Sequence, residues 1–210
     1  LAAEFINAGE SFVAVRYTDT EGDTGYYDQN GVSLRKAFLR APLDFRRISS
    51  NFKLARKHPI LGKMRAHKGT DYAASTGTPI YAAGDGKITF RGSKGGYGRT
   101  VIIKHGNIIE TRYAHLSRYG KFKSGQKVKQ GQVIGYVGMS GLATGPHLHY
   151  EFIISGVHRN PRTILEKLPK AKSLPRGEIA RFEPIAQPLI ASLSTQRSNA
   201  ELAFQNTTTR

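Results

Sequence analysis

Hydrophobic and polar residues alternate in short runs along most of the chain, and glycine-rich turns separate these runs. Between residues 46 and 162 the runs occur at 78–83, 87–91, 100–105, 110–115, 132–137 and 149–154. Strands that recur at a spacing of roughly 8 to 12 residues, with glycine turns between them, are typical of an antiparallel β sandwich or split barrel. Glycine recurs too often in this block for a long helix. We therefore expect a mainly β fold with an antiparallel sandwich or split-barrel core.

The N-terminal residues show a second, smaller β pattern. Residues 11–17 are apolar and β-branched, residues 21–25 form a turn cluster, and residues 26–27 begin a return strand. A lone hairpin is only marginally stable in water. We therefore expect residues 1–45 to be the C-terminal part of a truncated, β-rich N-terminal domain, followed by a connector.

The pattern changes after Pro161. Residues 162–168 predict a short helix that Pro169 ends, and Pro, Ser, Lys and Arg dominate the sequence from there to about residue 188. Residues 200–204 favour a helix only weakly. The sequence therefore predicts three parts: residues 1–45, a main domain at 46–168, and a basic tail at 169–210 that is extended or partly disordered.

Charge narrows the classes of partner. The formal net charge is +17, yet residues 1–30 carry six acids and a single base, so the remainder is more basic than the total suggests. Such a field favours a polyanion, and nucleic acid, acidic lipid and anionic cell wall all fit, as does a basic surface without a special partner. The absence of cysteine excludes disulfides and thiolate zinc ligands. No apolar run approaches the roughly 18 to 20 residues that span a bilayer.

Three histidine motifs carry the candidate chemistry. His147 and His149 are two residues apart at the start of a predicted strand, so both imidazoles point to one side; a solvated pair on an edge strand is the alternative. His67 and Asp71 lie where a loop runs into a strand, with Gly69 leaving room for a metal or substrate; a surface pair is the alternative there. Two imidazoles, one carboxylate and a water make a catalytic zinc site.

The remaining histidines are weaker candidates when each is taken by itself. His115 follows Tyr113 by two residues, on one face of a predicted strand, and a histidine near a strand end is more often structural. For His58, His105 and His158 we expect structural or solvent roles. The conjunction of the three motifs, rather than any one of them, favours a catalytic metal site.

The motifs together resemble the LytM/lysostaphin-type zinc metallopeptidases, which cut peptide cross-bridges in bacterial peptidoglycan. The resemblance covers roughly residues 49–161, and residues 33–40 before it are similar to the Gram-negative periplasmic or outer-membrane endopeptidases of this family. The matching segments are residues 48–52, 58–60, 67–74, 77–80, 84–86, 95–98, 113–116 and 141–151.

The resemblance implies a role for each matching residue. His67, Asp71 and His149 would hold Zn²⁺, while His115 and His147 would be catalytic, one taking a proton from water and the other holding the oxyanion, in an order that stays open. Tyr113, Asn51 and Tyr97 would line the substrate groove. None of the five metal and catalytic residues is substituted, which counts against the alternative, a non-cleaving regulator or activator of cell-wall amidases.

The resemblance also implies the biological setting. The substrate would be peptidoglycan rather than nucleic acid, and the bond the D-Ala–meso-diaminopimelate cross-link. We expect a monomer without a transmembrane segment of its own, derived from a longer protein whose signal or anchor lay upstream. Its location would be periplasmic, outer-membrane-associated or secreted, in a Gram-negative bacterium.

Overall fold

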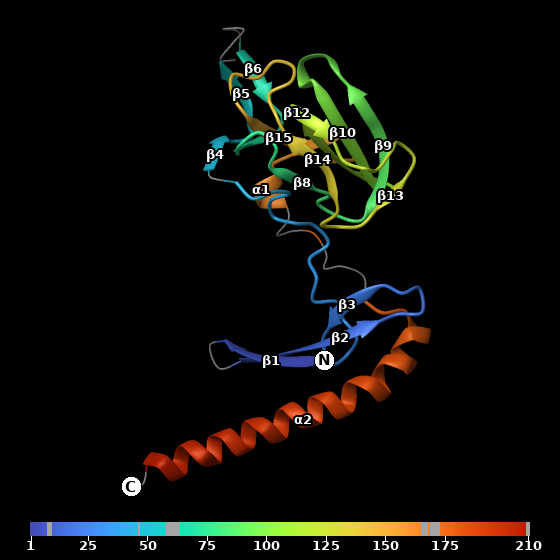
Figure 1. The fold of residues 1–210 in the computed structure, drawn as a ribbon, viewed down its shortest axis with the longest axis vertical. Helices are drawn as coiled ribbons and strands as arrows, with labels where there is room; N and C mark the ends of the chain where they lie inside the picture. The colour runs from blue at the N-terminus through green and yellow to red at the C-terminus, as the bar shows by residue number, and fades with distance from the viewer. Residues whose placement is uncertain (8–9, 46, 58–63, 165–167, 169–172, 209–210) are drawn as a thin grey trace. The chain divides into compact units, whose positions relative to one another are not determined.

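The structure is a computed structural model, which describes residues 1–7, 10–45, 47–57, 64–164, 168 and 173–208. The chain divides into two compact units, each described here by itself (Figure 1). Unit 1 is formed by residues 1–37 and 169–210, and unit 2 by residues 38–168.

Unit 2 is built from antiparallel strands. An eight-stranded sheet has the order β13-β9-β10-β11-β15-β7-β4, with β16 paired to β15, and a three-stranded sheet has the order β12-β14-β8. Strands β5 and β6 form a separate pair. The strands are β4 (Arg47–Ser50), β5 (Lys53–Lys57), β6 (Met64–His67), β7 (Thr70–Ala73), β8 (Pro79–Tyr81), β9 (Gly86–Ser93), β10 (Arg99–His105), β11 (Ile109–Ala114), β12 (Leu116–Tyr119), β13 (Lys127–Val128), β14 (Val133–Val137), β15 (His147–Ile154) and β16 (Val157–Arg159). The 3₁₀ turn η1 (Gly95–Tyr97) and the short helix α1 (Pro161–Ile164) complete unit 2.

The two faces of β15 serve different purposes. Successive side chains of a strand point to opposite faces, so His147, His149, Glu151 and Ile153 share one face, and the residues between them share the other. The second set is the core face: Leu148, Tyr150 and Phe152 are all fully buried. Polar groups that would be costly to bury among these apolar side chains are thereby gathered on the other face.

The smaller sheet contributes the other half of the core. Ile80 of β8, Ile134 of β14 and Leu116 of β12 are at most 1% exposed, as are Ile88 and Ile103 of the large sheet. The mainly antiparallel β fold that the alternating pattern predicted is therefore confirmed. From Phe38 onward the connector before β4 belongs to unit 2, where the Phe38 ring packs edge-on against the Phe152 ring, 5.0 Å between centroids.

Unit 1 begins with a three-stranded antiparallel sheet in the order β1-β2-β3. Its strands are β1 (Ala2–Asn7), β2 (Glu10–Thr18) and β3 (Thr24–Tyr27). The hairpin expected from residues 11–17 and 26–27 corresponds to β2 and β3, whose register pairs Val15 with Tyr27. Strand β1, which the sequence did not predict, pairs with the other edge of β2.

The C-terminal segment contradicts the extended tail that was predicted. Residues Arg176–Thr208 form one helix, α2, in spite of Pro184 and Pro188 within it. A proline lacks the N–H that would bond four residues back, which costs roughly 3 kcal/mol in a helix interior. Burial offsets this cost, because Phe182 and Ala186 of α2 are fully buried in a cluster with Val15 and Tyr17. The tail prediction failed because it weighed the prolines and missed the apolar spacing that buries one side of the helix.

The hydrogen bonds at the start of α2 join it to the sheet of unit 1. Tyr17 donates its hydroxyl proton to a Glu178 carboxylate oxygen at 2.7 Å, and Thr20 donates to the other oxygen. Among the described residues, α2 and the other helices lack the combination of length and apolar character that crossing a membrane requires.

Candidate metal centre

The first motif is positioned by a tight turn between two strands. His67 is the last residue of β6, and Lys68-Gly69 leads into β7, where Asp71 pairs directly with His149 of β15. A Cβ atom at Gly69 would lie 2.5 Å from the Tyr150 carbonyl oxygen and 2.8 Å from His149 Cε1. The space that we expected Gly69 to leave for a metal or substrate is therefore filled by β15. Glycine is required because that strand approaches so closely.

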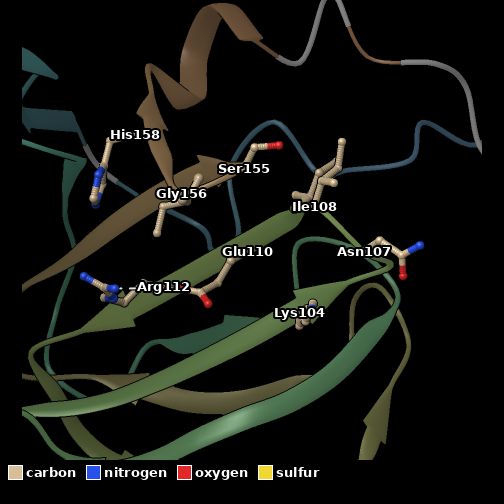
Figure 2. Close-up of a pocket in the computed structure, with 10 residues that line it drawn as sticks. Lys104, Asn107, Ile108, Glu110, Arg112, Ser155, Gly156 and His158 are labelled. Carbon is tan, nitrogen blue, oxygen red and sulfur yellow. Dashed lines mark ion pairs between the residues drawn. The ribbon is translucent and has the colours of Figure 1, made fainter.

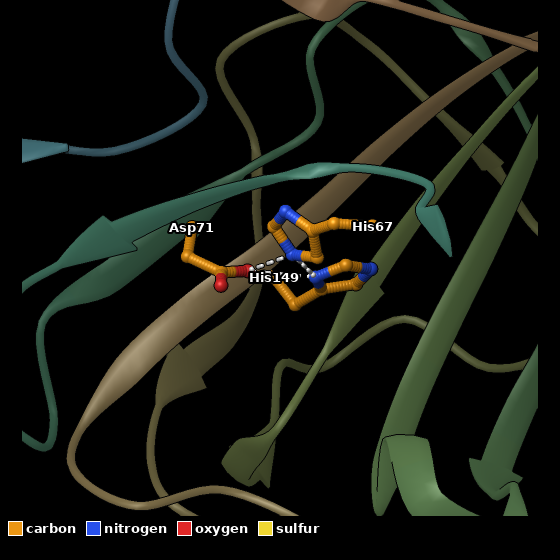
Figure 3. A group of neighbouring side chains, drawn as sticks. All are labelled: His67, Asp71 and His149. Carbon is orange, nitrogen blue, oxygen red and sulfur yellow. Dashed lines mark hydrogen bonds and ion pairs between the residues drawn. The ribbon is translucent and has the colours of Figure 1, made fainter. Parts of the chain in front are cut away.

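Three donor atoms converge at this point (Figure 3). Asp71 Oδ1 lies 3.1 Å from His67 Nε2 and 2.7 Å from His149 Nδ1, and the two nitrogens are 3.2 Å apart. All three residues are buried, with exposed fractions between 7% and 9%. The side chains that the sequence motifs singled out as metal-type residues therefore form one cluster.

The second nitrogen of each imidazole fixes its tautomer. His67 Nδ1 lies 2.8 Å from the Asn51 carbonyl oxygen, which only accepts, so Nδ1 carries the proton. His149 Nε2 lies 3.1 Å from a Glu151 carboxylate oxygen and donates to it in the same way. The neutral rings consequently point unprotonated nitrogens at each other and at the Asp71 carboxylate. The lone pairs of His67 Nε2, His149 Nδ1 and Asp71 Oδ1 repel one another, because no hydrogen lies between them. A cation at this point would remove the repulsion.

Without a metal, a proton fills this role. Burial opposes a charge on His149, but hydrogen bonds to Asp71 and Glu151 outweigh it and raise the pKa of His149 to about 9. Burial likewise opposes ionisation of Asp71, yet hydrogen bonds from His149 and His67 hold its pKa well below the usual range. The site therefore favours positive charge at its centre.

The donor set fits Zn²⁺. Zinc takes imidazole nitrogens and carboxylate oxygens, and donors at about 2.0–2.2 Å in a tetrahedral shell lie about 3.3–3.6 Å apart. The 2.7–3.2 Å separations between the three donor atoms are close to these edges. Three protein ligands leave a fourth position open, as in catalytic rather than structural zinc sites.

His115 and His147 flank the cluster. Their ring centroids are 4.7 Å apart, and His147 Nε2 lies 3.9 Å from Asp71 Oδ1. His115 Nδ1 donates to the Ser140 carbonyl oxygen at 2.7 Å, and His147 Nδ1 donates to the Gly145 carbonyl oxygen at 2.8 Å. Each ring is thus left with an unprotonated Nε2 that can accept a proton.

The backbone at His115 is unusual. His115 lies between β11 and β12 with φ of 61°, in the left-handed region that side-chain-bearing residues rarely adopt. Its N–H donates to the Tyr97 carbonyl oxygen at 2.9 Å. Burial, with a smaller contribution from the neighbouring His147 and His149, lowers the pKa of His115 to about 4. The ring is therefore neutral at physiological pH.

Glu151 belongs to the site, although the sequence analysis assigned it no role. It is fully buried and accepts four contacts: His149 Nε2 at 3.1 Å, the Tyr97 hydroxyl at 2.8 Å, Arg112 at 2.8 Å and His158 Nε2 at 3.1 Å. Burial opposes its charge, but His149 and Arg112 together lower the pKa of Glu151 to about 2. The sequence did contain one sign of this role: Glu151 follows His149 by two residues, so both side chains lie on the same face of the predicted strand.

Tyr113 does not lie in a groove, so that prediction is wrong. Its side chain is 0% exposed, on the core face of β11. The hydroxyl accepts from the Ala83 N–H at 2.8 Å and contacts Thr111 Oγ1 at 3.0 Å. Because His115 leaves the strand with a left-handed backbone, Tyr113 and His115 do not share a face.

Two further residues predicted to line the groove lie beside the His67–Asp71–His149 cluster. The Tyr97 ring is half-buried and lies 5.7 Å from the His149 ring, and its hydroxyl donates a hydrogen bond to Glu151. Asn51 is exposed; its carbonyl oxygen holds His67, and its side-chain oxygen accepts from Arg162 at 3.2 Å. Both residues therefore contact groups that orient the cluster.

Two of the histidines expected to be structural, His105 and His158, lie outside the cluster. His105 is buried, with Nδ1 2.7 Å from the Asp85 carbonyl oxygen and Nε2 2.7 Å from Thr111 Oγ1. His158 lies on β16 and contacts Glu151. The prediction for His58 falls outside the described residues.

Comparisons with known proteins agree with this geometry. The family model described as peptidase family M23 matches residues 65–161. The chain is 53% identical over 174 residues to the peptidoglycan DD-endopeptidase ShyC of Vibrio cholerae, covering 83% of this chain and 39% of that protein. It is 44% identical over 198 residues to the DD-carboxypeptidase/endopeptidase Mpg of Neisseria meningitidis, covering 92% and 45%. The chain thus spans less than half the length of these curated relatives.

Solved structures show the same likeness. A zinc-containing peptidase from Vibrio cholerae matches with a TM-score of 0.58 and 37% identity, over 77% of this chain and 49% of that one. Csd3 of Helicobacter pylori matches with a TM-score of 0.53 and 34% identity, over 94% and 52%. The matched residues 65–161 contain all the ligand-type and flanking histidines described above. They form a domain of peptidase family M23.

Proposed function

We propose that this chain is the catalytic part of a zinc-dependent endopeptidase that hydrolyses peptide cross-links of bacterial peptidoglycan. The observation that carries the proposal is the convergence of three lone pairs, from His67 Nε2, Asp71 Oδ1 and His149 Nδ1, beside two further histidines that each present an unprotonated Nε2. These three residues would hold Zn²⁺. A site that only bound a metal would not require the additional imidazole rings of His115 and His147.

The chemistry divides between the metal and the side chains. When bound, Zn²⁺ polarises the scissile carbonyl and makes water a stronger acid. His147 Nε2, which lies 3.9 Å from Asp71 Oδ1, is placed beside the metal cluster to take a proton from the attacking water. His147 then returns the proton to the leaving amine. His115 stays neutral and accepts a hydrogen bond at Nε2, which orients the water.

The names of the relatives support a proposal for the substrate. ShyC and ShyA of Vibrio cholerae are named peptidoglycan DD-endopeptidases, and Mpg is named a DD-carboxypeptidase/endopeptidase. We therefore propose the D-Ala–meso-diaminopimelate cross-link as the bond cut, outside the cytoplasm of a Gram-negative bacterium. Asn51, exposed beside His67, would line the groove together with the Tyr97 ring.

Digestion of purified, cross-linked Gram-negative peptidoglycan tests the proposal. The zinc-loaded chain, the chelated chain and His149→Ala would be compared, with products identified by mass. Loss of cross-linked dimers only with zinc and an intact His149 would support the endopeptidase and identify the bond. Intact dimers with stoichiometric zinc bound would favour the non-cleaving regulator. Intact dimers without zinc binding would contradict both.

A further inference from the structure

The positive charge of the chain is concentrated in one stretch of unit 2. Residues 86–140 contain eleven Lys and Arg residues and a single acid, Glu110. This stretch includes β9, β10 and β13, which are neighbours at one end of the large sheet (Figure 1). None of these bases has a part in the metal centre except Arg112, which contacts Glu151.

Three lysines of this stretch form a row across the sheet. The register pairs Lys127 of β13 with Lys87 of β9, and Lys87 with Lys104 of β10. Directly paired residues of antiparallel strands project from one face with Cβ atoms about 4.5–5.5 Å apart, and like charges there are destabilising. All three side chains are exposed, and within the described part of the chain no ion pair offsets them.

A pocket continues this row (Figure 2). It has a volume of about 530 Å³ and lies between the β10–β11 and β15–β16 turns, and its walls include Lys104, Glu110, Arg112, Ile153, Ser155 and His158. Arg112 is held by Glu151 at 2.8 Å and Glu110 at 3.6 Å. Lys104 lies opposite Glu110 in the β10–β11 register, while the Glu110 carboxylate contacts Arg112. Lys104 belongs to both the pocket and the row.

The pocket and the metal centre lie along one strand face. His149, Glu151 and Ile153 point to the same side of β15, with His149 in the metal cluster and Ile153 in the pocket wall. Four residues of strand span roughly 13 Å. An extended peptide of about four residues covers the same length. A ligand bound at the metal by one end can therefore reach the pocket, and a longer polymer can continue from there along the row that begins at Lys104.

We propose that Lys87, Lys104 and Lys127, together with the pocket that Lys104 borders, form a second binding surface for carboxylate groups of the polymeric substrate. The proposal rests on the proposed function, because it takes the substrate to be peptidoglycan, a polymer with many carboxylates. Ammonium groups are compact point charges that suit scattered carboxylates better than one fixed ligand. A second contact of this kind raises the affinity for a polymer far more than for a small fragment.

The test separates binding from cleavage. The variant K87Q/K104Q/K127Q is compared with K94Q/K121Q/K123Q, which removes the same charge from exposed lysines outside the row. Both proteins are treated with a chelator to prevent cleavage, and their sedimentation with purified sacculi is measured. We expect the dissociation constant of the row variant to rise at least about tenfold, and that of the control about twofold or less. Esterifying the carboxylates of the sacculi should reduce the affinity of the wild-type protein to that of the row variant.

Turnover of a soluble cross-linked peptide dimer is measured with zinc-loaded proteins. The dimer is chosen with fewer than about four residues on either side of the scissile bond, so it cannot span the distance from the metal to the pocket. Equal kcat/KM is therefore expected for the wild type and the row variant. Equal loss of sacculus binding in the two triple variants would overturn the proposal in favour of net charge. Loss of binding to phosphatidylglycerol vesicles but not to sacculi would overturn it in favour of a membrane. If the wild type does not cleave the dimer, the proposed function fails, whatever the binding shows.

Discussion

Glu151 Oε1 lies 3.1 Å from His149 Nε2, and the two side chains leave the same face of β15 two residues apart. This contact decides which nitrogen of His149 faces Asp71 and His67. Carboxylates that hold the remote nitrogen of a ligating histidine in this way also raise its basicity. The geometry of the metal centre thus depends on a residue that touches neither metal nor substrate.

Replacing Glu151 should weaken zinc binding more than it changes the fold. In Glu151→Gln the amide can still accept from His149, but without a charge, so we expect zinc affinity to fall by about 10- to 100-fold. Competition with a chromophoric chelator measures this. Tyr97→Phe, which removes only one donor to Glu151, serves as the milder control. Unchanged affinity in Glu151→Gln would contradict the role given to this contact.

The two flanking histidines should be separable from the ligands. His115→Ala and His147→Ala keep His67, Asp71 and His149, so we expect both variants to bind one zinc while kcat falls by about 10²- to 10⁴-fold. Metal content by atomic absorption and cleavage of cross-linked dimers give the two readouts. His149→Ala should lose both. Full activity in His147→Ala would remove it as the general base.

Stability of the metal-free chain should be greatest in mildly acid solution. The pKa of Glu151 is lowered to about 2, so its stabilising contribution is complete above about pH 4.5 and is lost as the pH falls toward 2. The pKa of His149 is raised to about 9, so its contribution is complete below about pH 6.5 and is lost as the pH rises toward 9. Measuring the Tm of the metal-free chain between about pH 2 and pH 9 checks both the acid and the alkaline loss of stability.

Zinc should change how the stability of the protein depends on pH above about pH 6.5. The metal replaces the proton on His149, so zinc binding becomes tighter as the pH rises and protons compete less. We expect the Tm of the zinc-loaded protein to be maintained between about pH 6.5 and 9 while that of the chelated protein falls. Parallel pH profiles of the two forms would show that zinc does not bind at His149.

Tyr113→Phe tests the placement of this ring in the core. The change leaves the buried Ala83 N–H without its acceptor, which should cost about 1–3 kcal/mol of stability. Urea unfolding measures the loss, and kcat/KM for cross-linked dimers should stay at the wild-type value. A selective loss of activity without loss of stability would place Tyr113 at the substrate after all.

Gly69→Ala should disturb the metal centre through backbone packing. The added methyl group overlaps the Tyr150 carbonyl oxygen and His149 Cε1, so β15 must shift, at a cost of about 1–3 kcal/mol. We expect weaker zinc binding together with a lower Tm. Gly177→Ala, whose Cβ would meet no atom within 4 Å, lies in helix α2 and is the control; it should leave zinc affinity unchanged and should not lower the Tm.

The sequence predicts what local periodicity determines. Alternation gave the strands of unit 2, and the period of two placed His147 and His149 on one side, where the structure brings both near Asp71. The contacts of Glu151 could not be predicted, because Tyr97, Arg112 and His158 come from η1, β11 and β16 and meet only through the sheet register. The helix α2 was missed for the same reason: burial of Phe182 against β2 overrides two prolines.

Because His115 has a left-handed backbone, the residue that best suits stability at this position is not the residue that suits activity. A side chain in that conformation costs roughly 1–2 kcal/mol, and glycine carries no such penalty. Random variation screened only for heat resistance would therefore drift toward glycine at this position and yield robust but inactive proteins. A histidine found there is a residue that selection for turnover, rather than for folding, must keep in place.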